Sequence, residues 1–268
     1  MPSARRGRPY GRGMSRPPRA TLTRSVAPGV HRLAHAEVSA YLIEDGDAVT
    51  LVDAGLPRMW QPLQRALAAI GRRPADVRAL VLTHAHFDHV GVARRVQEEW
   101  GVPVLGHPLE HHLAAHPYDY AHEDPRLPYP LTHPAGLPLL GSMLLAGALA
   151  VPGVEGVRSI APGDVLDVPG SPVVVFSPGH TWGHCALHLP DRDALITGDA
   201  LVTLDPYNAR TGPRVVAGAA TADIPLALAS LDALAATGAG VLLPGHGDPW
   251  RGGAVAAVEA ARTAGRPD

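Results

Sequence analysis

The sequence predicts an α/β fold in which two β-sheets lie face to face with helices on the outside. Short apolar runs come first in the chain, and later runs of the same kind alternate with helical patterns. Histidine or aspartate follows the end of several of these runs, as where His84 follows the run 79–83. Because rigid scaffolds often carry their reactive groups on such loops, we expect a polar site at one edge of the sheets.

Hydrophobic periodicity and turn residues give the expected elements in order. Strands are expected at 28–34, 38–44, 48–53 and 79–83, with helices over 60–70 and 91–100. The later expected strands are 103–105, 165–168, 172–177, 184–189, 193–197 and 240–243. Helices are expected near 222–236, with Thr221 as the N-terminal cap, and near 253–264.

The segment from Thr83 to His89 has the composition of a metal site. His84 and His86 alternate with Ala85, so an extended backbone points both imidazoles to one side, and Asp88 and His89 follow where the chain turns. Imidazole nitrogen and carboxylate oxygen suit zinc or iron. These residues are too close together to share one ion comfortably, so the loop predicts two neighbouring metals.

Three later segments offer the remaining ligands, because a first-row ion takes four or more donors and this loop has four groups for two ions. His180 and His184 follow the strand-like run 173–176. Asp199 follows the run 194–196 and is a carboxylate able to bridge two cations. His246 follows the run 241–243 and a glycine turn.

In this order the motifs resemble the metallo-β-lactamase superfamily, whose signature is H-x-H-x-D-H followed by His, Asp and His. The match begins upstream at 50–55, where Asp53 matches the aspartate of the first motif. The resemblance implies a four-layer αββα sandwich, with Asp53 and His184 orienting the ligands from behind. It also implies two zinc ions per chain, with iron or manganese as alternatives: one held by His84, His86 and His180, the other by Asp88, His89 and His246, and both by Asp199.

A site of this kind predicts a binuclear metal-dependent hydrolase. Two cations that share a water would lower its pKa from about 15.7 towards 7, which gives a bridging hydroxide able to attack a carbonyl carbon. Asp88 would be the catalytic residue that orients the water and shuttles its proton. The expected substrate is a small molecule with a carboxylic ester, lactone or thioester bond.

Other activities of the same fold remain as alternatives. Glyoxalase II shares all seven ligands, but its substrate-binding helices follow the last histidine, and only residues 247–268 follow His246 here. Acyl-homoserine-lactone hydrolases have a similar loop, but their tyrosine soon after the bridging aspartate is missing, and Tyr207 is a distant substitute. A zinc-dependent β-lactamase, a phosphodiesterase and a mononuclear iron persulfide dioxygenase are further alternatives.

The chain divides into an arm and one domain. Residues 1–24 carry seven arginines and no acidic residue, which predicts a disordered basic N-terminal arm. Residues 25–268 are expected to form a single catalytic domain. Within it, 107–153 is rich in His, Pro and apolar residues and predicts a lid or substrate-pocket insertion, with a homodimer interface as an equal alternative.

Charge and hydropathy exclude several classes of partner. The net charge of −2 predicts no general affinity for nucleic acid or for a membrane surface. No apolar run approaches the roughly 20 residues that a membrane-spanning helix needs. Arg5 and Arg6 are not followed by the apolar run of an export signal, so we expect a cytoplasmic protein.

Overall fold

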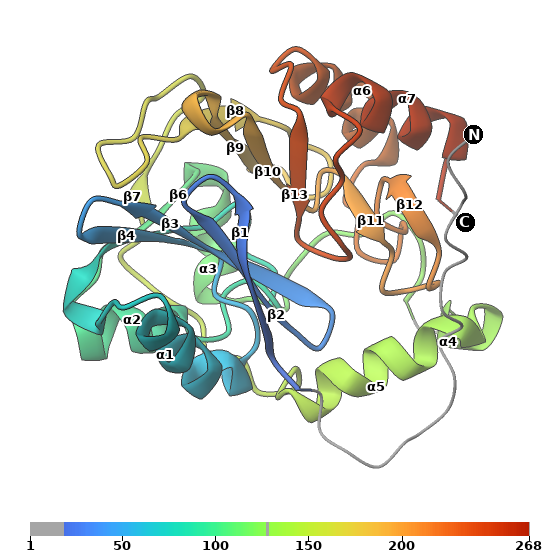
Figure 1. Ribbon diagram of the computed structural model, residues 1–268. Coiled ribbons are helices and arrows are strands. Elements are labelled where there is room, and N and C mark those ends of the chain that lie inside the picture. The colour runs from blue at the N-terminus through green and yellow to red at the C-terminus, as the bar shows by residue number, and fades with distance from the viewer. Residues whose placement is uncertain (1–18, 127–128, 268) are drawn as a thin grey trace.

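Two β-sheets pack face to face between two outer layers of helices (Figure 1). The computed structural model describes residues 19–126 and 129–267. The first sheet has seven strands in the order β1-β2-β3-β4-β5-β6-β7, and the second has four in the order β13-β10-β9-β8. This arrangement confirms the predicted four-layer αββα sandwich.

The first sheet begins as an antiparallel meander and continues with parallel strands. Strands β1 to β4 pair antiparallel, and β5, β6 and β7 are added parallel to β4. Its strands are β1 (Thr21–Ala27), β2 (Val30–His35), β3 (Val38–Asp45), β4 (Ala48–Val52), β5 (Val77–Val81), β6 (Val104–Gly106) and β7 (Arg158–Ser159). Helices α1 (Trp60–Ala69) and α2 (Ala93–Trp100) connect the parallel strands and lie on the same outer side in Figure 1. Short 3-10 turns, η1 (Pro57–Met59) and η2 (Pro74–Asp76), flank α1.

The second sheet contains β8 (Val173–Phe176), β9 (Cys185–Leu189), β10 (Ala194–Gly198) and β13 (Val241–Pro244). The 3-10 turn η5 (Pro190–Arg192) joins β9 to β10. Helices α6 (Ile224–Ala235) and α7 (Ala254–Ala264) cover this half of the molecule (Figure 1). A separate hairpin of β11 (Val202–Leu204) and β12 (Thr211–Arg214) stands beside them.

The insertion between β6 and β7 is mostly helical. It contains η3 (Pro108–Glu110), α3 (His111–Ala115), α4 (Tyr129–Thr132), η4 (Pro134–Gly136) and α5 (Leu137–Leu145). In Figure 1, α4 and α5 run together along the lower edge of the molecule, and α3 lies closer to the sheets.

Three apolar clusters fill the three interfaces between the four layers. Successive strand residues point to opposite faces, so neighbours enter different clusters. On β5, Leu80 packs towards α1 and α2, and Val81 packs between the sheets. On β10, Ile196 packs between the sheets, and Leu195 packs towards α6 and α7. The central strands of both sheets are therefore buried on both faces, whereas most of β1 and all of β7 at the edges of the first sheet are exposed.

The direction of the strands brings the polar residues of the site together at one edge of the sheets. Strand β4 is parallel to β5, and β10 is parallel to β13. The carboxyl ends of parallel neighbours meet at the same edge of a sheet, where ligands commonly bind in α/β folds. Asp53, His84, Asp199 and His246 each follow the end of one of these four strands.

The structure corrects several predicted elements. Strand β1 begins at Thr21, so residues 21–24 belong to the first sheet and not to the arm, because they pair with β2. Residues 1–18 lie outside the described part of the chain. The expected strand 165–168 is only an isolated bridge from Val165 to Val173. Strands β7, β11 and β12 were not expected, because they are short and lack a clear apolar alternation.

The structure also corrects the predicted N-terminal cap of helix α6. Asp223 is the N-terminal cap, and its carboxylate accepts a hydrogen bond from the backbone N–H of Leu226 at 2.8 Å. Thr221, the expected cap, is buried and its hydroxyl donates to the carbonyl of Val216. Across residues 19–126 and 129–267, no helix is both long and apolar enough to cross a membrane.

Tyr41 links the two sheets close to the polar site, and its removal should cost stability. Its buried hydroxyl on β3 donates to the carbonyl of Pro244 on β13 at 2.7 Å, and burial raises the pKa of Tyr41, so it stays a donor. Tyr41→Phe leaves that carbonyl unsatisfied and should lower the free energy of unfolding by about 1–2 kcal/mol. Urea unfolding followed by circular dichroism measures this, and wild-type stability would contradict it.

Candidate metal centre

The seven predicted ligands converge at one edge of the sandwich, in two groups. The ligand atoms of His84, His86 and His180 lie within 4.8 Å of one another. The same holds for the second group, made of Asp88, His89 and His246.

Asp199 lies between the two groups. Its Oδ2 is 3.5 Å from Nε2 of His180 in the first group and 3.1 Å from Nε2 of His246 in the second. Its Oδ1 is 3.6 Å from Nε2 of His89. The carboxylate therefore stands where the sequence expects a bridging ligand.

Hydrogen bonds outside the first group fix the tautomers of two of its histidines. Nδ1 of His84 lies 3.1 Å from the hydroxyl of Thr83, which itself donates to Asp53. Nδ1 of His180 lies 3.3 Å from the hydroxyl of Thr221, which donates elsewhere. Each hydroxyl has used its proton, so each accepts from Nδ1–H, and the lone pair on Nε2 faces the site.

The second group is held in the same way. Nδ1 of His89 lies 2.9 Å from Oδ2 of Asp53, and Nδ1 of His246 lies 2.9 Å from the carbonyl of Glu37. Both oxygens can only accept, so both Nδ1 atoms carry a proton and both Nε2 atoms face inward, where they can bind a cation once they give up any proton of their own. Such outer partners orient metal ligands and raise their basicity.

His86 is oriented differently from the other four histidines of the two groups. Its Nδ1 faces inward, 3.0 Å from Nε2 of His180, and its ring lies against Tyr120 with centroids 4.2 Å apart. Its Nε2 is buried without a hydrogen-bond partner in the described structure.

Several polar atoms of the site are buried without partners. Among the described residues these include Nε2 of His84, Nε2 of His89 and Oδ1 of Asp199. Buried polar atoms are normally satisfied, so converging ligand-type nitrogen and oxygen atoms without partners indicate a place for a cation. Ligands about 2.0 Å from a tetrahedral ion lie roughly 3.3 Å apart, and the distances of 3.0–3.6 Å around Asp199 and His180 agree with that spacing. The residues present therefore fit divalent cations.

The two groups differ in charge. Burial, together with the neighbouring imidazoles, holds the pKa of His84 well below its usual value and that of His180 at about 3, so these rings are neutral. Burial alone would raise the pKa of Asp88 and Asp199, but adjacent histidines outweigh it and lower both. Burial would lower the pKa of His89, but Asp199, Asp53 and Asp88 together raise it to about 9. The first group is thus neutral, whereas the second combines ionised carboxylates with His89, whose Nε2 proton a bound cation would replace.

Asp53 lies behind the second group and is hydrogen-bonded to His89. Its Oδ1 accepts from the backbone N–H of Thr83 at 2.8 Å, and its Oδ2 binds both the hydroxyl of Thr83 and Nδ1 of His89. It is buried and has φ of 59°, a left-handed conformation that is uncommon for a residue with a side chain. Such conformations occur mostly at functional sites, where the surroundings hold them in place.

His184 supports Asp199. Its Nε2 accepts from the backbone N–H groups of Asp199 at 3.0 Å and Ala200 at 3.2 Å, so its Nδ1 carries the proton and donates to Ser177. Its lone pair is engaged by the backbone and does not face the two ligand groups. His184 therefore holds the backbone at Asp199 in place.

Sequence reasoning missed four contributors to the site: Thr83, Glu110, Ser177 and Thr221. The threonines and the serine are ordinary residues whose roles depend on distant partners, so no local signal marks them. Glu110 is a buried carboxylate that accepts from the backbone N–H groups of Ala85 and Gly183. Its surroundings in sequence, a His-rich segment, gave no indication of this position.

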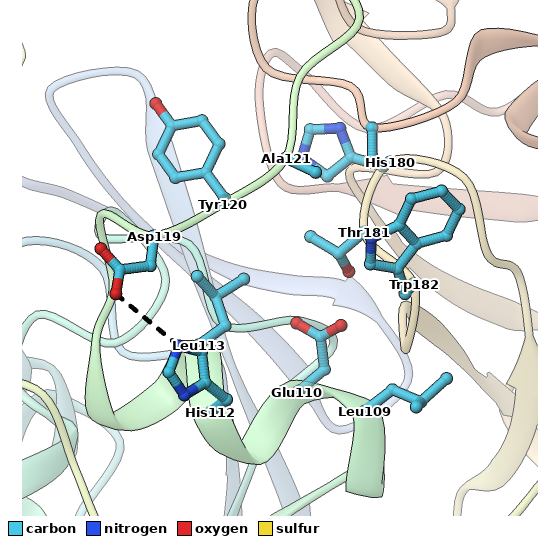
Figure 2. Close-up of a pocket in the computed structure, with 11 residues that line it drawn as sticks. Leu109, Glu110, His112, Leu113, Asp119, Tyr120, Ala121, His180, Thr181 and Trp182 are labelled. Carbon is cyan, nitrogen blue, oxygen red and sulfur yellow. Dashed lines mark ion pairs between the residues drawn. The ribbon is translucent and has the colours of Figure 1, made fainter.

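A cavity of about 130 Å³ opens beside His180 (Figure 2). Its walls come from residues 109, 110, 112, 113 and 119–121 of the insertion, from the loop 180–182, and from Ala222. Figure 2 shows Glu110 rising from the helical segment towards Thr181 and Trp182. Only the first part of the predicted lid lines this cavity. The leucines of α5 do not line it, and Leu144 and Leu145 are exposed.

Comparison with known proteins agrees with this geometry. A family model described as the metallo-β-lactamase superfamily matches residues 36–246. A probable metallo-hydrolase of Bacillus subtilis, YflN, is 28% identical over 240 residues, which cover 84% of this chain and 86% of the relative.

Two solved structures are also similar. The metallo-β-lactamase family protein TTHA1429 from Thermus thermophilus superposes with a TM-score of 0.62 and 26% identity, covering 88% of this chain and 78% of that one. TTHA1623, solved in a di-iron-bound form, superposes with a TM-score of 0.59 and 27% identity, covering 87% of this chain and 98% of that one. The chain belongs to the metallo-β-lactamase superfamily. It is an enzyme, a metallohydrolase of this superfamily.

Replacing Asp53 by Asn tests the support of the second group. Asn tolerates the left-handed backbone and has nearly the same shape, so the change removes the charge and one acceptor without new strain. Metal affinity at the second group should fall about 10–100-fold, because loss of an outer-shell partner typically has that effect. Titration of the chelator-treated protein with zinc measures this, and unchanged affinity would show that Asp53 does not orient His89.

Proposed function

We propose that the protein is a binuclear metal-dependent hydrolase that cleaves a carboxylic ester, lactone or thioester of a small molecule. The observation that carries the proposal is the position of Asp199, buried between two complete groups of ligand atoms. A mononuclear site would have no use for the second group, whose carboxylates and histidines are as buried as the first.

His84, His86 and His180 would hold one ion, and Asp88, His89 and His246 the other, with Asp199 shared. Bound divalent cations supply a hydroxide nucleophile at neutral pH and polarise a substrate carbonyl. We propose zinc in both positions, with iron or manganese as alternatives. The di-iron form of the similar protein TTHA1623 supports two adjacent ions in this fold and keeps iron among the alternatives.

Asp88 is the proposed residue for proton transfer. Its Oδ2 is 3.3 Å from Nε2 of His246 and 4.0 Å from Nε2 of His89, and its lowered pKa keeps it ionised. An ionised carboxylate at this place can accept the proton of an attacking water and pass it to a leaving group.

The cavity beside His180 supports a small substrate with an apolar part. Leu109, Leu113 and Trp182 line it, and a volume of about 130 Å³ holds only a short group. A substrate part seated there lies next to the first ligand group, so its carbonyl can reach the site. This part of the chain is therefore the proposed substrate pocket.

A panel of substrates tests the proposed function. The protein is purified without chelator, its zinc, iron and manganese are measured, and thioesters, lactones, β-lactams and phosphodiesters are assayed with and without oxygen. We expect two metal ions per chain and oxygen-independent hydrolysis of a thioester, lactone or ester. One iron per chain with oxygen-dependent turnover would contradict the proposal in favour of a dioxygenase.

Replacing Asp199 by Asn tests the bridging carboxylate. The change keeps the shape but removes the charge shared by both groups, so kcat should fall about 100- to 1000-fold. The matched control is Asp232→Asn on α6, which removes an exposed carboxylate that pairs with Arg262 at the surface. Full turnover by the Asp199 variant would rule out a shared ligand at this position.

A further inference from the structure

Glu110 is a buried carboxylate that the proposed metal site does not use as a ligand. It ends the short η3 turn that follows β6, and only 2% of its surface is exposed. Burying a carboxylate is costly unless hydrogen bonds compensate for the lost water. Its partners therefore indicate why the chain keeps it there.

Both oxygens of Glu110 accept hydrogen bonds from backbone N–H groups. Oε2 accepts from Ala85 at 2.9 Å, and Oε1 accepts from Gly183 at 2.8 Å. Ala85 lies between the ligands His84 and His86, and Gly183 lies three residues after His180. One side chain thus holds the two loops that supply the whole first ligand group.

These loops come from different sheets. The Ala85 loop follows β5 of the first sheet, and the Gly183 loop precedes β9 of the second. A backbone hydrogen bond from Cys185 to the carbonyl of Thr83, at 2.9 Å, joins the loops as well. Glu110 adds a second link, between Ala85 and Gly183, so the two loops are held at two points along their length.

Gly183 permits the close approach. A Cβ atom at this position would lie 2.8 Å from Oε1 and 2.9 Å from Cγ of Glu110, nearer than real Cβ contacts. The requirement is one of space, because the φ of Gly183 is not in the left-handed region. Glycine at position 183 therefore leaves room for the Glu110 carboxylate to accept hydrogen bonds from both peptide N–H groups.

We propose that Glu110 is a positioning residue that sets the distance between His84, His86 and His180, and so the affinity of the first metal position. It acts through the backbone N–H groups of Ala85 and Gly183 and not through the ligand nitrogens themselves. A carboxylate suits this task because it offers an acceptor to each loop, whereas an amide offers one acceptor and one donor. The inference rests on the proposed binuclear site and concerns only its first group.

The test uses two variants of the protein, each of which keeps only one of the two ligand groups intact. His246→Ala removes a ligand of the second group, and His84→Ala removes one of the first. Metal-free proteins are titrated with zinc in competition with a chromophoric chelator. Adding Glu110→Gln should lower zinc affinity about 10–100-fold in the His246→Ala background, and by less than about threefold in the His84→Ala background. Equal loss at both groups, or no loss at the first, would overturn the proposal.

Two controls keep the outcomes distinct. Glu99→Gln makes the same change at an exposed residue of α2 that pairs with Arg95, and it should leave both affinities unchanged. If Glu110→Gln does not fold by circular dichroism, Glu110→Asp is measured instead, since it keeps both oxygens on a shorter chain. Failure of both variants to fold with zinc present would overturn positioning in favour of a purely structural role.

The wild-type titration separates this inference from the proposed function. Two zinc sites in the wild type with unchanged affinity in the Glu110→Gln variant would overturn only the role of Glu110. Fewer than two sites in the wild type would contradict the binuclear proposal, and no zinc binding at all would contradict both.

Discussion

The burial of charge around Asp199 is the constraint on which the rest of the structure depends. Asp53, Asp88 and Asp199 are all buried at one edge of the sandwich. Carboxylates in such surroundings need compensating positive charge or hydrogen-bond donors. The same carboxylates raise the pKa of His89 to about 9 and that of His246 well above its usual value, so in the absence of a metal these two rings supply the compensating positive charge. Divalent cations placed between carboxylates and imidazoles satisfy both at once.

The fold provides this arrangement by bringing strand ends together and fixing each loop from behind. Asp53 orients His89, and His184 holds the backbone of Asp199. Glu110 holds the loops of the first group. None of these three needs to touch substrate, yet each sets the geometry on which the ligands depend, because loops are less constrained than the strands they follow.

Much of this could be predicted from the sequence, because the ligands stand in a fixed order directly after apolar strands. The layers followed from the order of the elements, in which short apolar runs come first and later ones alternate with helical patterns. Glu110 and Thr221 could not be predicted, because their partners lie far away in sequence and come close only when the two sheets pack. Strands β11 and β12 were missed for a different reason, since short hairpins with few apolar residues lack a periodic signal.

Anomalous X-ray scattering tests the central claim most directly. Crystals grown with zinc and measured on both sides of the zinc absorption edge locate each ion independently of any substrate. We expect two peaks, one among His84, His86 and His180 and the other among Asp88, His89 and His246, with Asp199 between them. A single peak, or peaks away from these residues, would contradict the binuclear site.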